Sequence, residues 1–388
     1  MFEIMDRDSQ EAVIKVIGVG GCGGNAVSHM IESNVSGVEF ICANTDMQAL
    51  KKSQAKTVLQ IGTDITKGLG AGARPDIGRE AALEDRDRIA EVIDGADMLF
   101  ITAGMGGGTG TGAAPIIAEV AKEMGILTVA VVTKPFSFEG KRTKVAQEGL
   151  EELSKHVDSL IVIPNEKLMQ VLGEDVPFLE AFKAANEVLH NAVAGIAEII
   201  NCPGLVNVDF ADVRTVMSEM GMAMMGSAMA TGTERARIAA EQAVASPLLE
   251  DVNLANARGV LVNITASGSF KMKEYYDVMN TIKAFTAEDA TVIVGNVFDE
   301  SIGDGLRVTM VATGLNGATA SRRQQKPELR VMSQVRDGTT NQPVFVGGSD
   351  DDGPAVFSSN GRRAQVEAMK LSGVEEYDIP AFLRKQAD

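Results

Sequence analysis

The segment Gly104–Gly112 limits what this chain can fold into more than any other feature, because six of its nine residues are glycine. It follows the apolar run Met98–Thr102, and its two threonines add hydroxyl donors. A strand that ends in such a loop before a helix lets backbone N–H groups approach a phosphate closely. Two more glycine-rich segments occur, Gly18–Gly24 and Gly68–Gly72. Each loop alone is typical of a tight turn without a ligand, but three together suit a triphosphate better than a dinucleotide.

Short apolar runs separated by helical stretches continue up to about Pro164. They include Val13–Val19, Val38–Ala43, Leu127–Thr133 and Leu160–Ile163, and most are continuously apolar instead of alternating. Continuous runs are typical of strands covered on both faces. Residues 1–177 are therefore predicted to form an α/β, Rossmann-like nucleotide-binding domain with a parallel sheet.

A long central helix is predicted over residues 178–202. Apolar residues recur there in steps of four and three, and Cys202-Pro203-Gly204 ends the pattern. About 23 residues at a rise of 1.5 Å each make a rod of roughly 35 Å. Residues 203–316 return to strand and helix patterns without another phosphate-binding loop, so we expect a second α/β domain. Its predicted strands are Gly259–Ala266, Thr291–Val297 and Leu306–Ala312, and its predicted helices are Glu234–Ala245 and Met272–Phe285.

The C-terminal part of the chain has a different composition. Residues 317–372 are rich in Ser, Arg, Gln, Gly, Pro and Asp and are predicted to be a disordered linker. Residues 373–388 place aromatic and aliphatic side chains around Asp378 and Pro380, which suit the start of a helical turn. We expect this segment to be a partner-binding peptide; a frayed terminus is the alternative.

Charge and cysteine content exclude several classes of function. The formal net charge is -17, and residues 317–388 hold ten Lys and Arg against ten Asp and Glu, so the acidic excess lies on residues 1–316. Such a body repels a phosphate backbone, and we expect no direct nucleic-acid binding. Three scattered cysteines and three scattered histidines indicate neither disulfides nor a zinc site. No run reaches the roughly 18 apolar residues of a membrane span, so we expect a cytoplasmic protein that contacts membranes only through partners.

The run Gly106-Gly107-Gly108-Thr109-Gly110-Thr111-Gly112 is the tubulin-type signature. With Ala43-Asn44-Thr45-Asp46, Asn207–Arg214 and the terminal Asp378–Lys385, it makes the chain resemble the FtsZ family of bacterial, tubulin-like cell-division GTPases. The likeness covers residues 12–316 almost continuously, together with the last dozen. It implies a GTPase that uses Mg²⁺, polymerises head to tail into protofilaments and forms a ring at midcell beneath the inner membrane. It also implies that residues 377–388 bind division proteins such as FtsA and ZipA.

The resemblance further implies which residues bind GTP and GDP. Glycine-rich loops would hold the phosphates, and Glu139 would bind the ribose. Phe182 would stack on the guanine, although it also lies on the apolar stripe of the central helix. Asn165 and Asn186 would lie at the base edge. The expected binding residues are Gly20, Gly21, Cys22, Gly23, Gly24, Asn25, Asn44, Ala71, Gly72, Ala73, Gly104, Gly107, Gly108, Thr109, Gly110, Glu139, Arg142, Asn165, Phe182 and Asn186.

Some of these positions depart from the usual family pattern. Cys22 stands where many relatives have glycine, and Asn186 where some have aspartate. The loop Phe138–Lys144 is one residue shorter than the family's, so that Arg142 comes early.

Asn207, Asp209 and Asp212 directly follow the predicted central helix and are the expected catalytic residues. At the far end of that helix they would lie roughly 35 Å from a guanine at its start, too far to act on the nucleotide of their own chain. In a head-to-tail contact they would enter a neighbour's γ-phosphate site and orient the attacking water. From spacing alone, Asp209 and Asp212 could equally cap or flank the next helix.

Two other functions stay open at this point. Gly18-x-Gly20-x-x-Gly23, followed by Asp46, is also the pattern of an NAD-dependent oxidoreductase with a Rossmann domain. A nucleotide-regulated scaffold without turnover is the third reading. A P-loop enzyme is excluded, because no Gly-x-x-x-x-Gly-Lys-Ser/Thr sequence occurs, so backbone amides and Mg²⁺ must hold the phosphates.

Overall fold

The computed structural model describes residues 12–173, 176–201, 208–219, 221–249, 254, 257–287 and 290–315, which lie within one compact unit, Met1–Gln325. The predicted linker, the predicted C-terminal peptide and the predicted catalytic residue Asn207 lie outside the described residues.

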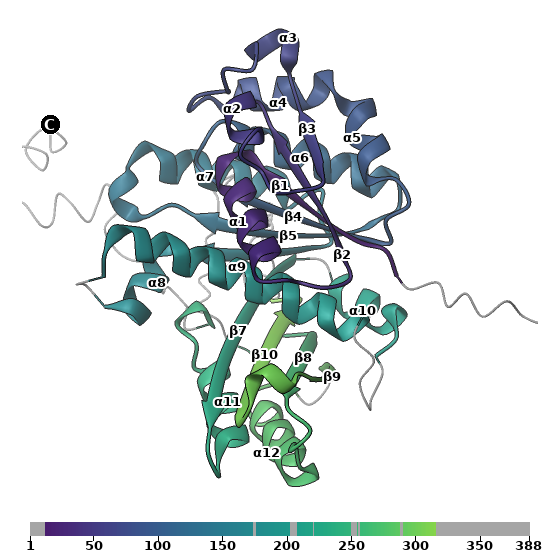
Figure 1. Ribbon diagram of the computed structural model, residues 1–388, viewed down its shortest axis with the longest axis vertical. Coiled ribbons are helices and arrows are strands. Elements are labelled where there is room, and N and C mark those ends of the chain that lie inside the picture. Colours follow the sequence, from purple (N-terminus) through teal and green to yellow (C-terminus); the bar gives the residue numbers. More distant parts are fainter. Residues whose placement is uncertain are drawn as a thin grey trace, which may run out of the picture. The chain divides into compact units, whose positions relative to one another are not determined.

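Strands and helices alternate along the first half of the chain (Figure 1). The strands are β1 (Ile14–Val19), β2 (Val38–Asn44), β3 (Thr57–Gln60), β4 (Met98–Gly104), β5 (Leu127–Lys134) and β6 (Ser159–Pro164). The helices are α1 (Gly20–Glu32), α2 (Met47–Leu50), α3 (Thr63–Thr66), α4 (Pro75–Glu84), α5 (Arg86–Ile93), α6 (Thr109–Glu123), α7 (Lys141–Leu153) and α8 (Asn165–Leu172), with a 3₁₀ turn η1 (Ser137–Glu139).

The second half begins with the central helix and continues with strands and helices. Its helices are α9 (Phe178–Asn201), α10 (Phe210–Met217), α11 (Arg235–Val244) and α12 (Met272–Lys283), with 3₁₀ turns η2 (Pro247–Leu249) and η4 (Glu300–Ile302). Its strands are β7 (Gly221–Thr231), β8 (Gly259–Ala266), β9 (Thr291–Phe298) and β10 (Gly305–Thr313).

The described strands form one ten-stranded sheet in the order β3-β2-β1-β4-β5-β6-β7-β10-β8-β9. Strands β1 to β6 are all parallel, which confirms the parallel sheet predicted from their continuous apolar runs. β7 is parallel to β6 over Gly221–Ala223 and antiparallel to β10. β8 is antiparallel to β10 and parallel to β9. The sheet therefore passes from the first half into the second without a break and becomes mixed there.

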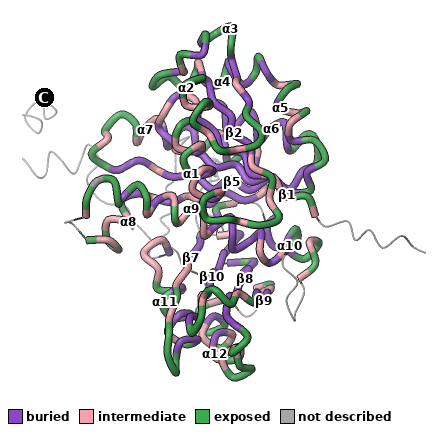
Figure 2. The backbone as a smooth tube through the Cα atoms, viewed as in Figure 1, coloured by how far each residue is buried: buried purple, intermediate pink, exposed green. Residues whose placement is uncertain are grey.

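Helices cover both faces of the first-half sheet. Apolar residues of α4, α5, α6 and α7 pack on one face. Residues of α1, α9 and α10 pack on the other, in a cluster that also takes in Met225 of β7, Leu261 of β8 and Val311 of β10. A third cluster joins α11 and α12 to β8 and β10. Figure 2 shows the central strands buried along most of their length. Helix α9 thus packs against strands from both halves.

Helix α9 crosses the sheet from one edge to the other. Near its start, the Phe182 ring lies 5.8 Å from that of Phe136, which follows the carboxyl end of β5. At its end, Asn201 Nδ2 donates to Gly37 O, 2.6 Å away, just before the amino end of β2. Its 24 residues span roughly 36 Å at 1.5 Å each. The predicted long central helix is confirmed, and the structure has it over Phe178–Asn201.

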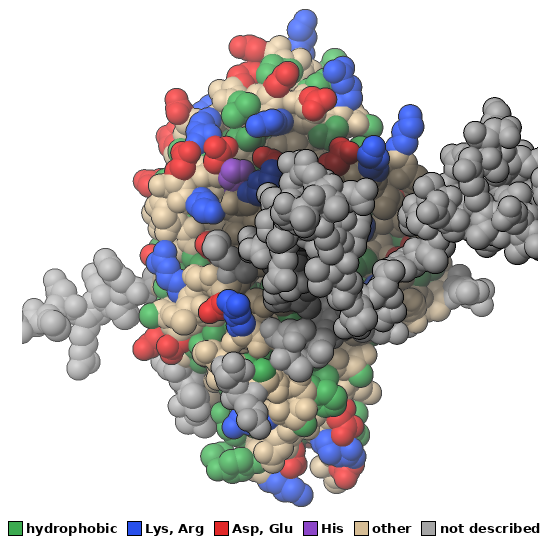
Figure 3. All heavy atoms as spheres, turned by 180° about the vertical axis from the view of Figure 1, so that it is seen from behind, with side chains coloured by type: hydrophobic (Ala, Val, Ile, Leu, Met, Phe, Trp, Pro, Cys, Tyr) green, Lys and Arg blue, Asp and Glu red, His purple; other side chains and the backbone are tan. Residues whose placement is uncertain are grey.

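Acidic and basic side chains are mixed on the surface. Figure 3 shows Lys and Arg side chains interspersed with Asp and Glu on the face opposite that of Figure 1. Within the part of the chain that the structure describes, no helix is both long and apolar enough to cross a membrane.

Candidate functional site

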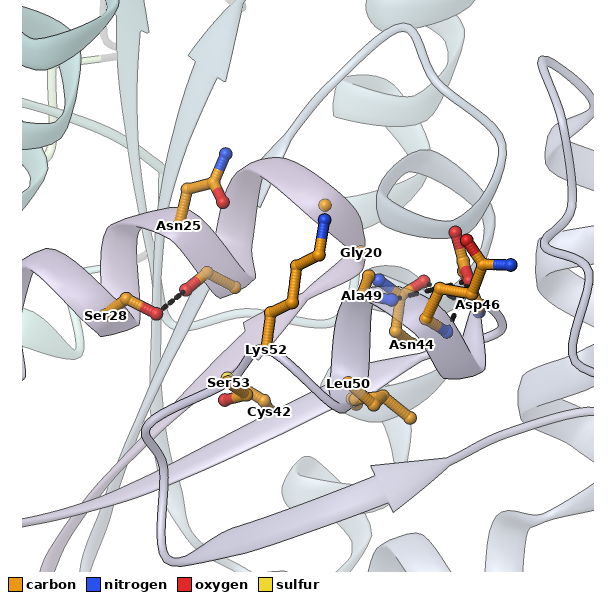
Figure 4. A pocket seen from close by; sticks show the side chains of 14 residues that line it. Gly20, Asn25, Ser28, Cys42, Asn44, Asp46, Ala49, Leu50, Lys52 and Ser53 are labelled. Carbon is orange, nitrogen blue, oxygen red and sulfur yellow. Dashed lines mark hydrogen bonds between the residues drawn. The ribbon is translucent and has the colours of Figure 1, made fainter.

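Two adjoining pockets lie at the edge of the sheet where the parallel strands β1, β2, β4, β5 and β6 end. This is the edge where ligands bind in open α/β sheets. The first, the loop pocket, has a volume of about 280 Å³ and is lined by Val19, Gly21, Cys22, Gly72, Gly104, Met105, Gly107, Gly108, Thr109, Gly110, Thr133, Pro135, Glu139, Arg142, Asn165 and Phe182. The second, the helix pocket, has a volume of about 290 Å³ and is lined by Gly20, Gly21, Gly24, Asn25, Ser28, Cys42, Ala43, Asn44, Asp46, Gln48, Ala49, Leu50, Lys52 and Ser53 (Figure 4).

Helices α1 and α6 both begin at this site. Gly20, the first residue of α1, has a φ of +73°, which an L side chain rarely adopts. A Cβ at Gly20 would lie 3.0 Å from the backbone nitrogen of Gly110, so the starts of the two helices touch. Neither helix has an acidic residue in its first turn. Their exposed N–H groups and positive dipole ends therefore favour an anion here.

The three glycine-rich segments converge as the sequence predicts. The loop between β4 and α6 is held by Thr111, whose Oγ1 accepts from Gly106 N at 2.8 Å. A Cβ at Gly108 would lie 2.3 Å from Gly72 O, so the segment Gly68–Gly72 packs directly on the segment Gly104–Gly112. A Cβ at Gly107 would meet nothing within 4 Å, and this residue lines the loop pocket. The arrangement can surround a chain of phosphates with backbone N–H groups.

The opposite side of the loop pocket carries an aromatic ring and a free acceptor. Phe182 is 37% exposed and meets the buried ring of Phe136 at an interplanar angle of 77°. Asn165 is 6% exposed, and its Oδ1 has no hydrogen-bond partner among the described residues. A buried acceptor without a partner is costly, so a ligand with N–H donors fits this position. A flat heterocycle with N–H groups at its edge matches both features.

Glu139 and Arg142 form an ion pair at the rim of the loop pocket. Glu139 Oε1 accepts from Phe136 N at 2.9 Å, and its second oxygen pairs with Arg142 Nη1. Arg142 Nε also donates to Gly106 O at 3.4 Å. The carboxylate retains lone pairs that can accept from a hydroxyl of a ligand.

The Cys22 thiol lies inside the loop pocket. Its sulfur is 3.7 Å from Thr133 Oγ1. Burial raises the pKa of the Cys22 thiol, while Thr133 and Arg142 oppose that shift. The thiol is therefore neutral near pH 7 and presents an uncharged side chain to any ligand.

Four of the expected binding residues line neither pocket. Gly23 is buried, and a Cβ there would lie 2.3 Å from Thr102 O, so this glycine allows α1 to pack on β4. Ala71 is buried beneath Gly108, whereas Ala73 is exposed. Asn186 is half-buried on α9. The other sixteen expected residues do line the two pockets.

Asp209 and Asp212 lie at the opposite edge of the sheet. Both are exposed, Asp212 on helix α10 and Asp209 directly before it. Arg214 holds this helix in place, because its Nη2 donates to Gly125 O, just before the amino end of β5, at 3.0 Å. Ser159, the first residue of β6, donates through Oγ to Met217 O at 2.6 Å. Asp209 occupies the N-cap position, but its side chain makes no capping hydrogen bond. The two carboxylates are thus separated from the pockets of their own chain by the length of the strands.

Asp46, the acid that the oxidoreductase hypothesis assigns to a ribose, lines the helix pocket and caps a helix. Its Oδ1 accepts from Gln48 N at 2.7 Å and from Ala49 N at 3.4 Å, which caps helix α2.

Sequence reasoning missed several residues that line the site. Thr133 lines the loop pocket, and Gln48, Lys52 and Ser53 line the helix pocket. Figure 4 shows the Lys52 side chain extending toward the start of α1. The pair Lys51-Lys52 follows a strand and a short helix. This feature of the sequence could have predicted a positively charged side chain near the anion-binding loops.

Within the described residues, no group of three or more His, Cys, Asp and Glu could hold a metal ion.

These features define the protein as an α/β nucleotide-binding protein in which glycine-rich loops, and not a P-loop, line the ligand pockets. The model of the Tubulin/FtsZ family, GTPase domain, matches residues 13–173, and that of the FtsZ family, C-terminal domain, matches residues 221–316. The chain belongs to the FtsZ family.

Full-length relatives and solved structures support the same assignment to the FtsZ family. The chain is 58% identical over 400 residues to the cell division protein FtsZ of Pseudomonas aeruginosa, covering 100% of both chains. It is 44% identical to FtsZ in the structure of an empty dimer from M. jannaschii, with a TM-score of 0.77 over 80% of this chain and 90% of that one. The chain also shares the fold of CetZ2 from Haloferax volcanii in a GTPγS-bound protofilament. The two chains are 19% identical, with a TM-score of 0.66 over 80% of this chain and 96% of CetZ2. The comparisons give no support to an oxidoreductase.

Proposed function

We propose that this protein is a GTPase whose active site is completed by a second copy in a head-to-tail filament. One observation carries the proposal: the nucleotide pockets and the exposed carboxylates Asp209 and Asp212 lie at opposite edges of the same sheet. Contacts that join one edge to the opposite edge of the next copy generate an open filament. The dimer of FtsZ from M. jannaschii agrees with such self-association.

The loop pocket would bind GTP with its phosphates over Gly107–Gly110 and the start of α1, and with its base against Phe182 and Asn165. Guanine carries N–H donors that can satisfy the free Asn165 Oδ1. Glu139 is the ribose partner in this proposal, and Mg²⁺ bound to the phosphates would neutralise their charge. Asp209 and Asp212 of the adjacent copy, together with its Asn207, then orient and polarise the water that attacks the γ-phosphate.

The rate of GTP hydrolysis per subunit as a function of protein concentration tests the proposal. Little activity is expected below a threshold and a steep rise above it, because an isolated subunit lacks half of its site. Asp212→Ala should keep its affinity for GTP and lose turnover by about 100-fold or more, the usual scale of general acid–base catalysis. Asp87→Ala, which removes an exposed carboxylate from the first turn of α5, is the matched control.

Three results would contradict the proposal in different ways. A rate per subunit that does not depend on concentration points to a monomeric enzyme. Retained GTP binding without turnover at any concentration points to a scaffold. Normal turnover by Asp212→Ala removes the role of the second copy.

The biological setting follows the relatives named as cell division proteins. We propose that the filaments form in the cytoplasm and assemble into the division ring at midcell, beneath the inner membrane. Residues 377–388 would connect the ring to membrane-associated division proteins such as FtsA and ZipA. The chain itself would then need no membrane anchor.

A further inference from the structure

Thr45 is a buried residue beside the phosphate loops that lines neither pocket. It directly follows β2 and is 0% exposed. Its Oγ1 lies 2.7 Å from Oγ1 of Thr109, the first residue of α6, which is half-buried and lines the loop pocket. Two hydroxyls that are 64 residues apart in the sequence thus meet directly behind the phosphate site.

The burial of Thr45 determines which hydroxyl donates. Among the described residues, Thr109 Oγ1 is the sole hydrogen-bond partner of Thr45 Oγ1. If Thr109 donated to Thr45, the Thr45 proton would be left without an acceptor in a place closed to water, which is costly. Thr45 therefore donates, and Thr109 accepts. The proton of Thr109 is then free to point into the loop pocket.

The backbone of Thr45 is held by the third glycine-rich segment. Thr45 O accepts from Gly70 N and from Thr66 Oγ1, each at 3.3 Å. Close by, Met47 N donates to Gly68 O at 3.1 Å. The backbone that carries the Thr45 side chain is thus held in place independently of the bond to Thr109.

We propose that Thr45 is a positioning residue for the phosphate site: its hydroxyl holds the Thr109 hydroxyl with its proton aimed at a phosphate oxygen. The proposal rests on the proposed binding of GTP in the loop pocket. A donor oriented before the ligand arrives needs no reorganisation when the anion binds, so it contributes more than a freely rotating hydroxyl.

Calorimetric titration of GTP and GDP into Thr45→Val tests this inference. Valine keeps the shape and removes the hydroxyl, and we expect about three- to tenfold weaker binding, the usual effect of one neutral hydrogen bond. Thr45→Ser restores the hydroxyl and should restore affinity. Thr102→Val is the matched control, because Thr102 is equally buried in β4 and its Oγ1 has no partner among the described residues.

A double-mutant cycle separates positioning from a general structural effect. Thr45→Val acts only through Thr109 in this proposal, so in a Thr109→Val background it should cause no further loss of affinity. Should Thr45→Val fail to fold, Thr45→Ala, which leaves space instead of a methyl group, allows the same comparison.

Unchanged affinity in Thr45→Val, or an equal loss in the Thr109→Val background, would overturn the inference. An equal loss in Thr102→Val would do so as well. Failure of the unmodified protein to bind GTP would instead overturn the proposed function, so the two failures are distinguishable.

Discussion

Glu198 is a carboxylate that helix α9 holds largely away from water. Its Oε2 accepts from Asn263 Nδ2 at 3.1 Å, and its Oε1 lies 3.4 Å from Arg307 Nη2 on β10. Burial raises the pKa of Glu198, and Asp299 adds to the shift, whereas Arg307, Asn263 and Thr265 oppose it. The charged form of this residue therefore has a cost that its partners only partly offset.

Replacing this residue changes how stability depends on pH. The folded pKa of Glu198 lies above the unfolded value of about 4.3, so its contribution to stability is fully present below that value and is lost as the pH rises through the folded pKa. Glu198→Gln does not titrate. The free energy of unfolding of Glu198→Gln minus that of the unmodified protein should therefore increase as the pH is raised from about 4 toward neutrality. Urea unfolding over this range measures it, with the exposed Glu91→Gln as control, and a constant difference would contradict the expectation.

At the scale of elements, several glycines serve packing between helices and not ligand binding. Helices α4 and α6 cross where Gly78 and Gly112 face the other backbone. A Cβ at Gly112 would lie 2.0 Å from Pro75 O, and one at Gly78 would lie 2.4 Å from Gly108 O. The glycine-rich segment thus lines the phosphate site with one part and packs against α4 with another.

Gly112→Ala should therefore separate α4 from α6. We expect a loss of about 1–3 kcal/mol in the free energy of unfolding, the usual cost of overpacking, although alanine favours helix formation. Gly24→Ala on α1 is the matched control, because a Cβ there meets nothing within 4 Å, and it should gain up to about 1 kcal/mol. Denaturant unfolding without nucleotide measures both changes. A stabilised Gly112→Ala would show that α4 moves away without cost.

At the scale of the whole molecule, one sheet and one helix connect the edge of the described unit that holds the pockets with the edge that carries α10. The sheet continues from β6 through β7 to β10, and α9 packs on strands of both halves. The parallel strands end at the nucleotide pockets and begin beside α10. A change at one end can therefore reach the other only through packed elements. In the proposed filament, the unlike ends of adjacent copies meet.

Deletion of residues 377–388 should leave assembly intact, because the described sheet, pockets and α10 lie before residue 316. GTP-dependent sedimentation should match that of the full chain, while recruitment to vesicles carrying FtsA or ZipA should be lost. Deletion of residues 350–361, an equal length of the predicted linker, is the control and should preserve recruitment. Loss of sedimentation after deletion of residues 377–388 would contradict the assignment of this segment to partner binding.

Several elements could not be predicted from local patterns. Strand β7, with the sequence Gly-Met-Ala-Met-Met-Gly-Ser-Ala-Met-Ala-Thr, has a single β-branched residue, the terminal Thr231, although such residues are typical of strands. Its pairing with β6 and β10 forms it. Strand β3 has only four residues, and its pairing with β2 forms it. In the site, the free acceptor of Asn165 and the bond between Thr45 and Thr109 appear only when distant segments pack together.

Local sequence patterns were sufficient to predict the parallel strands, the central helix and the three glycine-rich loops, because apolar periodicity and glycine act over a few neighbouring residues. Tertiary structure alone decided which glycines face the pocket and which allow close packing, as Gly107 and Gly112 illustrate. It also decided that Asp209 is not a side-chain cap and that Asp46 is one. These outcomes depend on atoms that lie far apart along the chain and meet only in the folded protein, so no local pattern can encode them.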